Sequence, residues 1–273
     1  MRLKESYRML LSVKELGVSV AQNGEYCELL HDISFSLKPG EIFTIIGESG
    51  SGKTTLARAL TNLFPPHWAI ERVGVIEFEN LDLAALDEKD LNSLRRQSIR
   101  YIFQEPALAF NPVLKIKRQI QLALHTTQCN GMDDSNDHES FHTLLHQLDI
   151  NDLEGTINAY PHQLSVGTLQ RIHIALAIAP KPKLLIADEP TSSVDALQSV
   201  QILTLLRSYC KRYTMGMLLI THDLGIAEHF ADTIAILSGG RIVECAPKDR
   251  FFQQPRHPYS QLLVEKTSNN EHA

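Results

Sequence analysis

The chain has 273 residues, of which 43% are hydrophobic and 21% charged, and its formal net charge is −6. This is the composition of a globular protein with ample chain for a packed core. The acidic balance argues against a protein that binds nucleic acid through a broad basic surface. The scattered cysteines form no C-x-x-C pair, which disfavours a zinc ribbon or a redox motif and suits a reducing compartment.

The N-terminus, M-R-L-K-E-S-Y-R-M-L, lacks the apolar segment of a secretory signal. No apolar run approaches the roughly 18 residues that a membrane span needs. We therefore expect a cytosolic chain whose association with a membrane comes through a partner.

The first elements in chain order are strands. Alternating and apolar runs predict strands within residues 11–46, and the last run, I-F-T-I-I, leads into a glycine-rich loop. The segment T-T-L-A-R-A-L-T-N-L that follows has helical spacing. The P-P pair at 65–66 predicts a turn, V-G-V-I-E-F-E-N predicts further strands, and the charge-rich residues 87–98 predict an exposed helix.

Residues 106–180 differ in character, because helical patterns replace the strand runs. We expect a helical subdomain there, with the polar stretch N-G-M-D-D-S-N-D at 130–137 as its solvated loop.

Strands return after Pro180. K-L-L-I-A-D and G-M-L-L-I-T-H predict buried strands, and I-A-I-L-S-G-G-R-I-V-E predicts a hairpin about Gly239–Gly240. Strands that alternate with helices predict an α/β fold with a parallel sheet. One face of the helix between the two buried strands is expected to consist of Val200, Leu203, Leu206 and Cys210.

Residues 47–55, G-E-S-G-S-G-K-T-T, satisfy the pattern G-x-x-x-x-G-K-[ST] between a predicted strand and a predicted helix. The glycines let backbone amides surround phosphates, Lys53 reaches the β- and γ-phosphates, and the Thr54 hydroxyl ligates Mg²⁺. The residues of this phosphate loop are Gly47, Glu48, Ser49, Gly50, Ser51, Gly52, Lys53, Thr54 and Thr55.

A second motif, L-L-I-A-D-E-P at 184–190, delivers two carboxylates at the C-terminal end of a strand, where α/β sheets bind ligands. Asp188 would hold Mg²⁺, directly or through water. Glu189 would orient and polarise the attacking water, because phosphoryl transfer depends mainly on positioning and charge neutralisation. The motif is weak alone and strong beside a phosphate loop.

A further anion-facing helix start is expected at L-S-V-G-T-L-Q-R, residues 164–171, where Ser165 and Gly167 precede an apolar helical pattern. One nucleotide needs only one phosphate-binding loop, so the chain taken alone does not explain why it has a second anion-facing segment.

These motifs, with F-Q-E-P at 103–106 and I-T-H-D at 220–223, follow one another in the order seen in ATP-binding-cassette (ABC) ATPases, and the resemblance covers nearly the whole chain. It implies an α/β P-loop ATPase core, residues 1–105 and 181–250, with an N-terminal antiparallel β subdomain. An inserted α-helical signature subdomain, residues 106–180, and a C-terminal tail, residues 251–273, complete the expected nucleotide-binding domain. In this family two cassettes pair head to tail, so the second anion-facing segment serves the partner's nucleotide.

The resemblance assigns roles to further residues. Gln104 resembles the glutamine that senses Mg²⁺ and the attacking water, and its loop faces the transmembrane partner. Ser165 and Gly167 would contact the opposing γ-phosphate. Asp195 lies where the inter-subunit aspartate loop is expected, and His222 resembles the switch histidine that touches the γ-phosphate. The adenine-stacking aromatic falls in V-S-V-A-Q-N-G-E-Y, where Tyr26 is the candidate and Val20 is the alternative occupant of the position.

Residues 103–112 and 256–263, F-Q-E-P-A-L-A-F-N-P and R-H-P-Y-S-Q-L-L, are similar to the extended glutamine loop and the tail signature of importers for oligopeptides, dipeptides and nickel. Such an importer implies ATP and Mg²⁺ as cofactors, two transmembrane permease subunits, an extracytoplasmic substrate-binding protein and no nucleic acid. It also implies a peripheral position on the cytoplasmic face of the inner membrane. The short tail without cysteine favours nickel or metal-chelate uptake, and short peptides stay open as cargo.

The signature L-S-V-G departs from the usual L-S-G-G at Val166. A β-branched residue there suggests a weaker closure over the opposing γ-phosphate. We therefore expect a second, different ABC ATPase subunit as partner, in a heterodimer rather than a homodimer.

Two alternative functions, from classes other than importers, are also considered. One is a soluble ABC ATPase that acts on ribosomes or chromosomes. The other is a metalloprotease built on H-E-S-F-H at 138–142, whose histidine stripe continues at His146, but a solvated helix face explains this spacing more simply. D-D-S-N-D resembles a calcium loop only in part, because the sixth and twelfth positions from Asp133 are His138 and Leu144, where Gly and Glu are needed.

Overall fold

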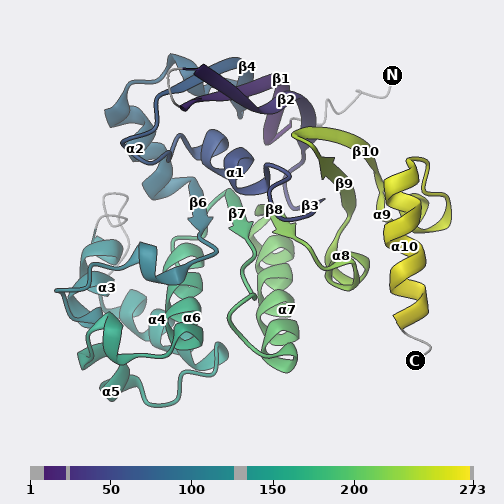
Figure 1. Cartoon of the computed structure of the whole chain (residues 1–273). Coiled ribbons are helices and arrows are strands. Elements are labelled where there is room, and N and C mark those ends of the chain that lie inside the picture. Colours follow the sequence, from purple (N-terminus) through teal and green to yellow (C-terminus); the bar gives the residue numbers. More distant parts are fainter. Residues whose placement is uncertain (1–8, 23–24, 126–133, 271–273) are drawn as a thin grey trace, which may run out of the picture. The chain divides into compact units, whose positions relative to one another are not determined.

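The computed structural model describes residues 9–22, 25–125 and 134–270 (Figure 1). The chain forms two compact units, one made of the residues up to Leu91 together with those from Gly216 onward, and the other of Asn92–Met215. The division into a core, a helical insertion and a tail expected from the sequence stays a prediction.

The first unit contains β1 (Leu11–Gln22), β2 (Glu25–Leu37), β3 (Ile42–Ile46), α1 (Lys53–Thr61), β4 (Ile70–Phe78), β5 (Leu81–Asp82), β8 (Gly216–Thr221), α8 (Leu224–Phe230), β9 (Thr233–Ser238), β10 (Arg241–Pro247), α9 (Lys248–Gln253) and α10 (Pro258–Asn270). Helix α2 (Glu88–Gln97), which the charge-rich stretch predicts, crosses the boundary between the units.

One sheet of this unit is antiparallel, with strand order β2-β1-β4-β5. Buried and more exposed side chains alternate along β1, as a sheet with one covered face requires. The register shifts between Val13 and Leu16, and the buried positions shift with it, so that Leu16, Val18 and Val20 stay on the covered face. The expected N-terminal antiparallel β subdomain is thus confirmed.

The other strands of the first unit run in the order β10-β9-β3-β8, with β3 parallel to both β9 and β8. All residues of β3 are buried, as expected for parallel strands covered on both faces. The predicted hairpin joins β9 to β10 through Gly239 and Gly240, whose φ angles of 53° and 73° suit a tight two-residue turn.

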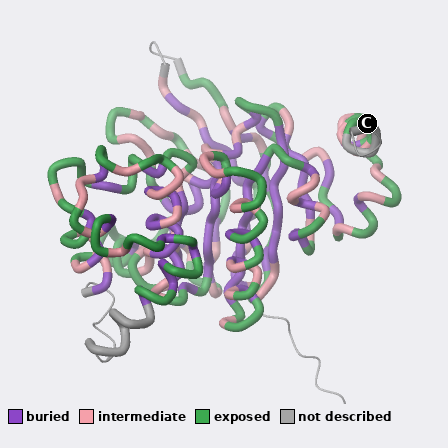
Figure 2. Tube along the Cα trace, turned by 90° about the horizontal axis from the view of Figure 1, so that it is seen from below, coloured by how far each residue is buried: buried purple, intermediate pink, exposed green. Residues whose placement is uncertain are grey.

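The second unit contains β6 (Ile99–Ile102), α3 (Ile116–His125), α4 (Asp134–Gln147), α5 (Leu153–Asn158), α6 (Val166–Ile178), β7 (Leu184–Asp188) and α7 (Ala196–Tyr213). Strands β6 and β7 are parallel. Parallel strands and helices in the same chain confirm the predicted α/β class. Strands β6 and β7 are buried along most of their length, whereas helix α7 has both buried and exposed positions. Figure 2 colours the chain by burial.

Within the polar stretch at 130–137, residues 130–133 lie outside the described part of the chain. Residues 134–137 are not a loop as predicted, since they form the first turn of α4. Acidic side chains such as Asp134 and Asp137 stabilise the N-terminal end of a helix, which reconciles this polar composition with helical structure.

Of the four residues expected on one face of α7, Leu203, Leu206 and Cys210 are buried together and Val200 is not. Val200 is 54% exposed, and Ile202 is buried in its place. At about 100° per residue, Val200 projects roughly a quarter-turn from the centre of the stripe formed by the other three residues. Within the described residues, no helix has both the length and the hydropathy that a membrane span requires.

Candidate nucleotide site

The phosphate loop leaves the buried strand β3 at Gly47 and enters helix α1 at Lys53. Gly50 and Gly52 have φ angles of 80° and 106°, a region that side chains with a Cβ adopt only at a cost. The N–H groups in the first turn of α1 have no acceptor within the helix and carry its positive dipole end. Strand, glycine loop and helix occur in the predicted order, which is the arrangement that binds phosphate.

The loop is packed closely from behind. A Cβ atom on Gly47 would lie 2.3 Å from the carbonyl oxygen of Leu237 and 2.5 Å from Oγ of Ser51, so only glycine fits. Oγ of Ser51 is buried and has no hydrogen-bond partner among the described residues. A phosphate oxygen would satisfy such a hydroxyl, so the loop fits a nucleotide.

The ammonium group of Lys53 is folded across the loop. Its Nζ donates to the carbonyl oxygen of Gly47 at 2.7 Å and to that of Glu48 at 2.8 Å, and the side chain is buried. A buried cation held only a few ångströms from the loop backbone is positioned to neutralise phosphate charge.

His222 lies beside the phosphate loop in the same unit. Ile46 of β3 pairs with Thr221 of β8 in parallel register, so Gly47 and His222 leave adjacent strand ends. His222 is exposed, and the next residue, Asp223, caps α8 by accepting from the N–H groups of Gly225 and Ile226. The structure therefore brings the predicted histidine to the edge of the sheet that carries the loop.

The second unit brings Gln104 and Glu189 together. Ile102 of β6 pairs with Ala187 of β7, and Gln104 and Glu189 each lie two residues beyond this pair, so the two residues are neighbours. Nε2 of Gln104 donates to Oε2 of Glu189 at 3.2 Å. The backbone of Glu189 is left-handed, with φ 47°, which turns the chain sharply at the end of β7.

Asp188, the last residue of β7, is buried, and the hydroxyl of Tyr101 donates to its Oδ2 at 3.1 Å. Sequence reasoning missed Tyr101, which belongs to no motif, although it lies two positions before the F-Q-E-P segment on the neighbouring strand. A carboxylate with its orientation fixed in this way has the oxygen ligands that Mg²⁺ prefers.

Helix α6 supports both segments through side chains that the sequence analysis did not single out. The imidazole of His173 stacks on Phe103 with ring centroids 5.5 Å apart, and Nε2 of Gln170 donates to the carbonyl oxygen of Pro190 at 2.9 Å. Burial lowers the pKa of His173 to about 4, so this ring is neutral at physiological pH. The aromatic stack fixes the residue before Gln104, and the amide fixes the residue after Glu189.

The signature segment starts α6. Ser165 is its N-cap, and its Oγ accepts from the N–H of Thr168 at 3.1 Å. Gly167 lies within the first helical turn rather than in the loop before it. A Cβ atom there would approach the carbonyl oxygen of Ser193 to 3.2 Å, so close packing favours glycine. The predicted helix start is present, and its role in binding an anion stays a prediction.

Asp195 caps α7, with its side chain accepting from the N–H of Gln198 at 2.9 Å, and it is exposed.

The two candidates for the adenine-stacking position differ in solvent exposure. Tyr26 is exposed on β2, whereas Val20 is buried in the sheet and cannot present its side chain to a base.

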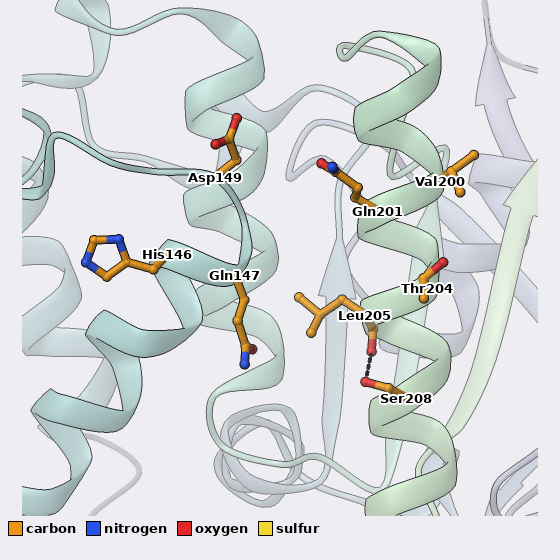
Figure 3. A pocket seen from close by; sticks show the side chains of 8 residues that line it. All are labelled: His146, Gln147, Asp149, Val200, Gln201, Thr204, Leu205 and Ser208. Atoms are coloured by element: carbon orange, nitrogen blue, oxygen red, sulfur yellow. Dashed lines mark hydrogen bonds between the residues drawn. The ribbon is translucent and has the colours of Figure 1, made fainter.

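The histidine stripe on α4 shows no convergence on a metal. The side chain of His138 lies outside the described residues, and among the described ones no group of three His, Cys, Asp or Glu side chains is arranged to hold an ion. His146 instead lines an open hollow of about 590 Å³ between the end of α4 and α7, and its ring points away from α7 (Figure 3). The other residues around this hollow are Gln147, Asp149, Val200, Gln201, Thr204, Leu205 and Ser208.

The sequence and the fold were compared with those of known proteins. The family described as ABC transporter matches residues 30–192. The oligopeptide transport ATP-binding protein OppD of Lactococcus lactis is 38% identical over 264 residues, which make up 96% of this chain and 77% of that protein. The peptidoglycan transport ATP-binding protein YejF of Agrobacterium fabrum is 40% identical over 262 residues, or 96% of this chain and only 48% of the relative.

Solved structures of ATP-binding cassettes have a similar fold. The ATP-binding cassette MJ0796, in a dimeric post-hydrolysis state bound to ADP and Pi, has a TM-score of 0.76 at 26% identity and covers 87% of this chain and 98% of its own. An ATP-binding subunit of an ABC transporter has a TM-score of 0.74 at 27% identity and covers 94% and 99%. The matched region exceeds half of the chain and contains the phosphate loop and the D-E-P motif, so the chain belongs to the ABC transporter family and is an ATPase.

Proposed function

We propose that this chain is the ATP-hydrolysing subunit of an ABC importer for short peptides. The observation that carries the proposal is the similarity to OppD, an oligopeptide transport ATP-binding protein, over nearly the whole of this chain. The dipeptide transport ATP-binding protein DppD of Bacillus subtilis, 36% identical over 93% of this chain and 76% of its own length, supports the same cargo class.

In the proposed reaction the phosphate loop binds ATP. Lys53 neutralises the β- and γ-phosphates, and the backbone N–H groups of the loop and Oγ of Ser51 hold the phosphate oxygens. Thr54, Asp188 and Gln104 would hold Mg²⁺, which supplies further charge neutralisation when bound. Oxygen donors of these three kinds suit that ion.

Glu189 is the proposed general base. Its carboxylate would orient and polarise the attacking water, and the hydrogen bond from Gln104 would keep that carboxylate in place. His222, exposed at the neighbouring end of β8, would contact the γ-phosphate. Tyr26 is the candidate for stacking on adenine, because it is the exposed member of the two alternatives.

A second cassette would complete the site. Ser165 and Gly167 would close on the γ-phosphate held by the partner's loop, with Asp195 at the contact between subunits. The dimeric cassette bound to ADP and Pi supports such pairing for this fold. Val166 in the signature favours a heterodimer, in which this chain's phosphate loop meets a partner's better signature.

The remaining partners are two permease subunits and an extracytoplasmic binding protein, which would hold the chain at the cytoplasmic face of the inner membrane. Nickel or a metal chelate is the second cargo candidate. A soluble ABC ATPase that acts on ribosomes or chromosomes is not favoured, because the relatives described above bear transport names.

Uptake by cells that lack this gene tests the proposal. Wild-type protein restores ATP-dependent uptake of radiolabelled di- and tripeptides, and the Glu189→Gln variant does not. Restored uptake of ⁶³Ni²⁺ with unchanged peptide uptake would assign the metal-chelate cargo instead. Unchanged uptake of both, with the chain purifying with ribosomes or DNA, would contradict an importer.

A further inference from the structure

The turn between β9 and β10 holds the phosphate loop from behind. Strand β9 lies next to β3, the strand that leads into the loop, and the two are parallel (Figure 1). In the turn that follows β9, the N–H of Gly240 donates to the carbonyl oxygen of Ser51, in the middle of the loop, at 3.1 Å. The carbonyl oxygen of Gly240 in turn accepts from the N–H of His31 on β2 at 2.8 Å. Two backbone hydrogen bonds through one glycine thus connect the antiparallel sheet to the loop.

The bond from Gly240 fixes the direction in which one peptide of the loop faces. The peptide bond between Ser51 and Gly52 is trans, so its C=O and its N–H point in opposite directions. Because the C=O of Ser51 points to the turn, the N–H of Gly52 points away from the turn. That direction is the side of the loop on which a phosphate would bind.

The backbones at this junction are in close contact. A Cβ atom on Gly240 would lie 2.5 Å from the carbonyl oxygen of Leu29 and 2.7 Å from Cδ2 of His31. A Cβ atom on Gly52 would lie 3.2 Å from the same carbonyl oxygen of Leu29. Gly239 differs, because a Cβ atom there would meet nothing within 4 Å. A displacement of the turn at Gly240 is therefore transmitted to the loop.

We propose that Gly240 is a positioning residue of the nucleotide site, whose N–H holds the Ser51 peptide so that the N–H of Gly52 faces the phosphates of ATP. The proposal rests on the phosphate-binding role proposed for the loop above. Gly50 and Gly52, with φ angles of 80° and 106°, flank Ser51 and give this peptide freedom to rotate. Without the bond from Gly240, the peptide would have to be ordered when ATP binds, and affinity would fall.

Gly240→Ala tests the contact, and Gly239→Ala is the matched control. Both substitutions place a Cβ atom at a positive φ in the same turn, but only the first meets a carbonyl oxygen and forces the turn away from its neighbours. In the full chain, we expect the Kd for ATP of Gly240→Ala to exceed that of Gly239→Ala about threefold to tenfold, as for the loss of one hydrogen bond. In the assembled transporter, kcat at saturating ATP should stay within twofold, because the residues proposed for catalysis are untouched.

An ester in place of the Gly240 amide removes the N–H alone, and it tests the proposal even if Gly240→Ala does not fold. The same replacement at Gly239 is its control, and we expect the same threefold to tenfold difference in Kd. Equal Kd values within the ester pair, or a fall in kcat at an unchanged Kd, would overturn the proposal.

Lys53→Ala tests the underlying assignment separately. If that variant binds ATP as wild type does, the phosphate-loop role fails and the proposal for Gly240 falls with it. If Lys53→Ala binds ATP weakly while the Gly240 variants bind it as their controls do, the positioning role alone is wrong.

Discussion

Val166 begins α6 with a helical backbone, and it is not among the described residues with positive φ. The β-branched side chain therefore costs no backbone strain at this position. The side chain is 56% exposed, so what distinguishes it from the glycine usual in the subfamily is bulk on the surface proposed to face a partner's nucleotide.

Val166→Gly tests that bulk. In the assembled transporter we expect ATP turnover to rise, or transport to stay intact, because the phosphate of the opposing nucleotide gains room. Val200→Gly, at another half-exposed valine on α7, controls for the loss of helix propensity, which is roughly 0.5–1 kcal/mol. If Val166→Gly lowers both turnover and transport while Val200→Gly does not, the valine is an adapted part of the closed site and the weak-signature hypothesis is wrong.

His173 should make the free energy of unfolding depend on pH. Burial lowers its pKa to about 4 in the folded chain, against an ordinary value of about 6.5, so the unfolded chain binds the proton more readily between these values. Stability is then complete above pH 6.5 and falls as the pH drops toward 4, by about 3 kcal/mol at most.

Urea titrations at several pH values check this prediction. His173→Phe keeps an aromatic ring against Phe103 and removes the titrating group, at the cost of the hydrogen bond between the imidazole and the Tyr101 backbone. Its stability should be lower at pH 7 but should decline less between pH 6.5 and 4. An equal decline in both proteins would show that other groups govern the acid sensitivity.

The histidines on α4 are predicted to be dispensable for ATP hydrolysis. Replacing His138, His142 and His146 together with alanine should leave the ATPase rate within a few-fold of wild type, because His142 and His146 are exposed. Lys53→Ala serves as the reference for a site residue. An ATPase loss as large as that of Lys53→Ala would mean that the stripe is a working metal site after all.

At the scale of single elements, the anchoring of the tail depends on one buried carboxylate, since Glu244 of β10 accepts from the backbone N–H groups of Arg256 at 2.9 and 3.1 Å and of His257 at 2.9 Å. Glu244→Gln replaces this ion by a neutral amide, part of which is a donor. We expect a loss of about 1–3 kcal/mol in the free energy of unfolding at pH 7, as for hydrogen bonds to a charged group. Glu77→Gln, which removes only the exposed ion pair with Lys14, should change it by less than about 1 kcal/mol.

The pH dependence of that loss has a definite sign. Burial alone would raise the pKa of Glu244, but its hydrogen bonds lower that pKa in the folded chain, so its contribution is complete above the ordinary carboxyl pKa and disappears as the pH falls through the folded value. The difference between wild type and Glu244→Gln should therefore shrink in acid. A difference that stays constant down to pH 3 would indicate a packing defect instead of a lost carboxylate.

The elements that the sequence predicts best are those with a strong local cause. The apolar run of β3, the glycines at 50 and 52 and the G-G turn at 239–240 each require one backbone conformation, and each has it. The start of α4 was predicted wrongly, because a polar composition suits both a loop and a helix N-terminus. Val200 was placed on the same face of α7 as three buried residues but is exposed, because helical spacing alone does not fix the width of a buried stripe.

In the candidate site, too, some residues could be predicted from the sequence and others could not. Motif residues such as Gln104 and Glu189 are neighbours because parallel strands β6 and β7 end at the same sheet edge, which the order of elements implies. Tyr101, Gln170 and His173 could not be predicted, since each acts through a tertiary contact between segments far apart in the chain.

At the scale of the whole molecule, the chain carries a complete set of ABC motifs divided between two compact units. The phosphate loop and His222 belong to one unit, and Gln104, Asp188, Glu189 and the signature belong to the other. The proposed reaction uses residues of both units. The proposed second cassette adds its signature to that site, so activity should depend on assembly as well as on each unit.

Lys53→Ala tests the binding half of this scheme. Loss of the phosphate-neutralising cation should weaken ATP binding by one to two orders of magnitude, consistent with about 1.5–3 kcal/mol for a charge-assisted contact. Equilibrium binding of a fluorescent ATP analogue to the full chain measures this directly. Affinity equal to that of wild type would remove Lys53 from the site.

The most direct test of the central claim is the fate of ATP on the Glu189→Gln variant. ATP affinity, hydrolysis rate and dimer formation would be measured together on the full chain, with wild type alongside. We predict ATP binding within a few-fold of wild type, turnover reduced at least about 100-fold, as for the loss of a general base, and accumulation of an ATP-bound dimer with its partner cassette. Wild-type turnover by Glu189→Gln would contradict the catalytic assignment on which the account depends.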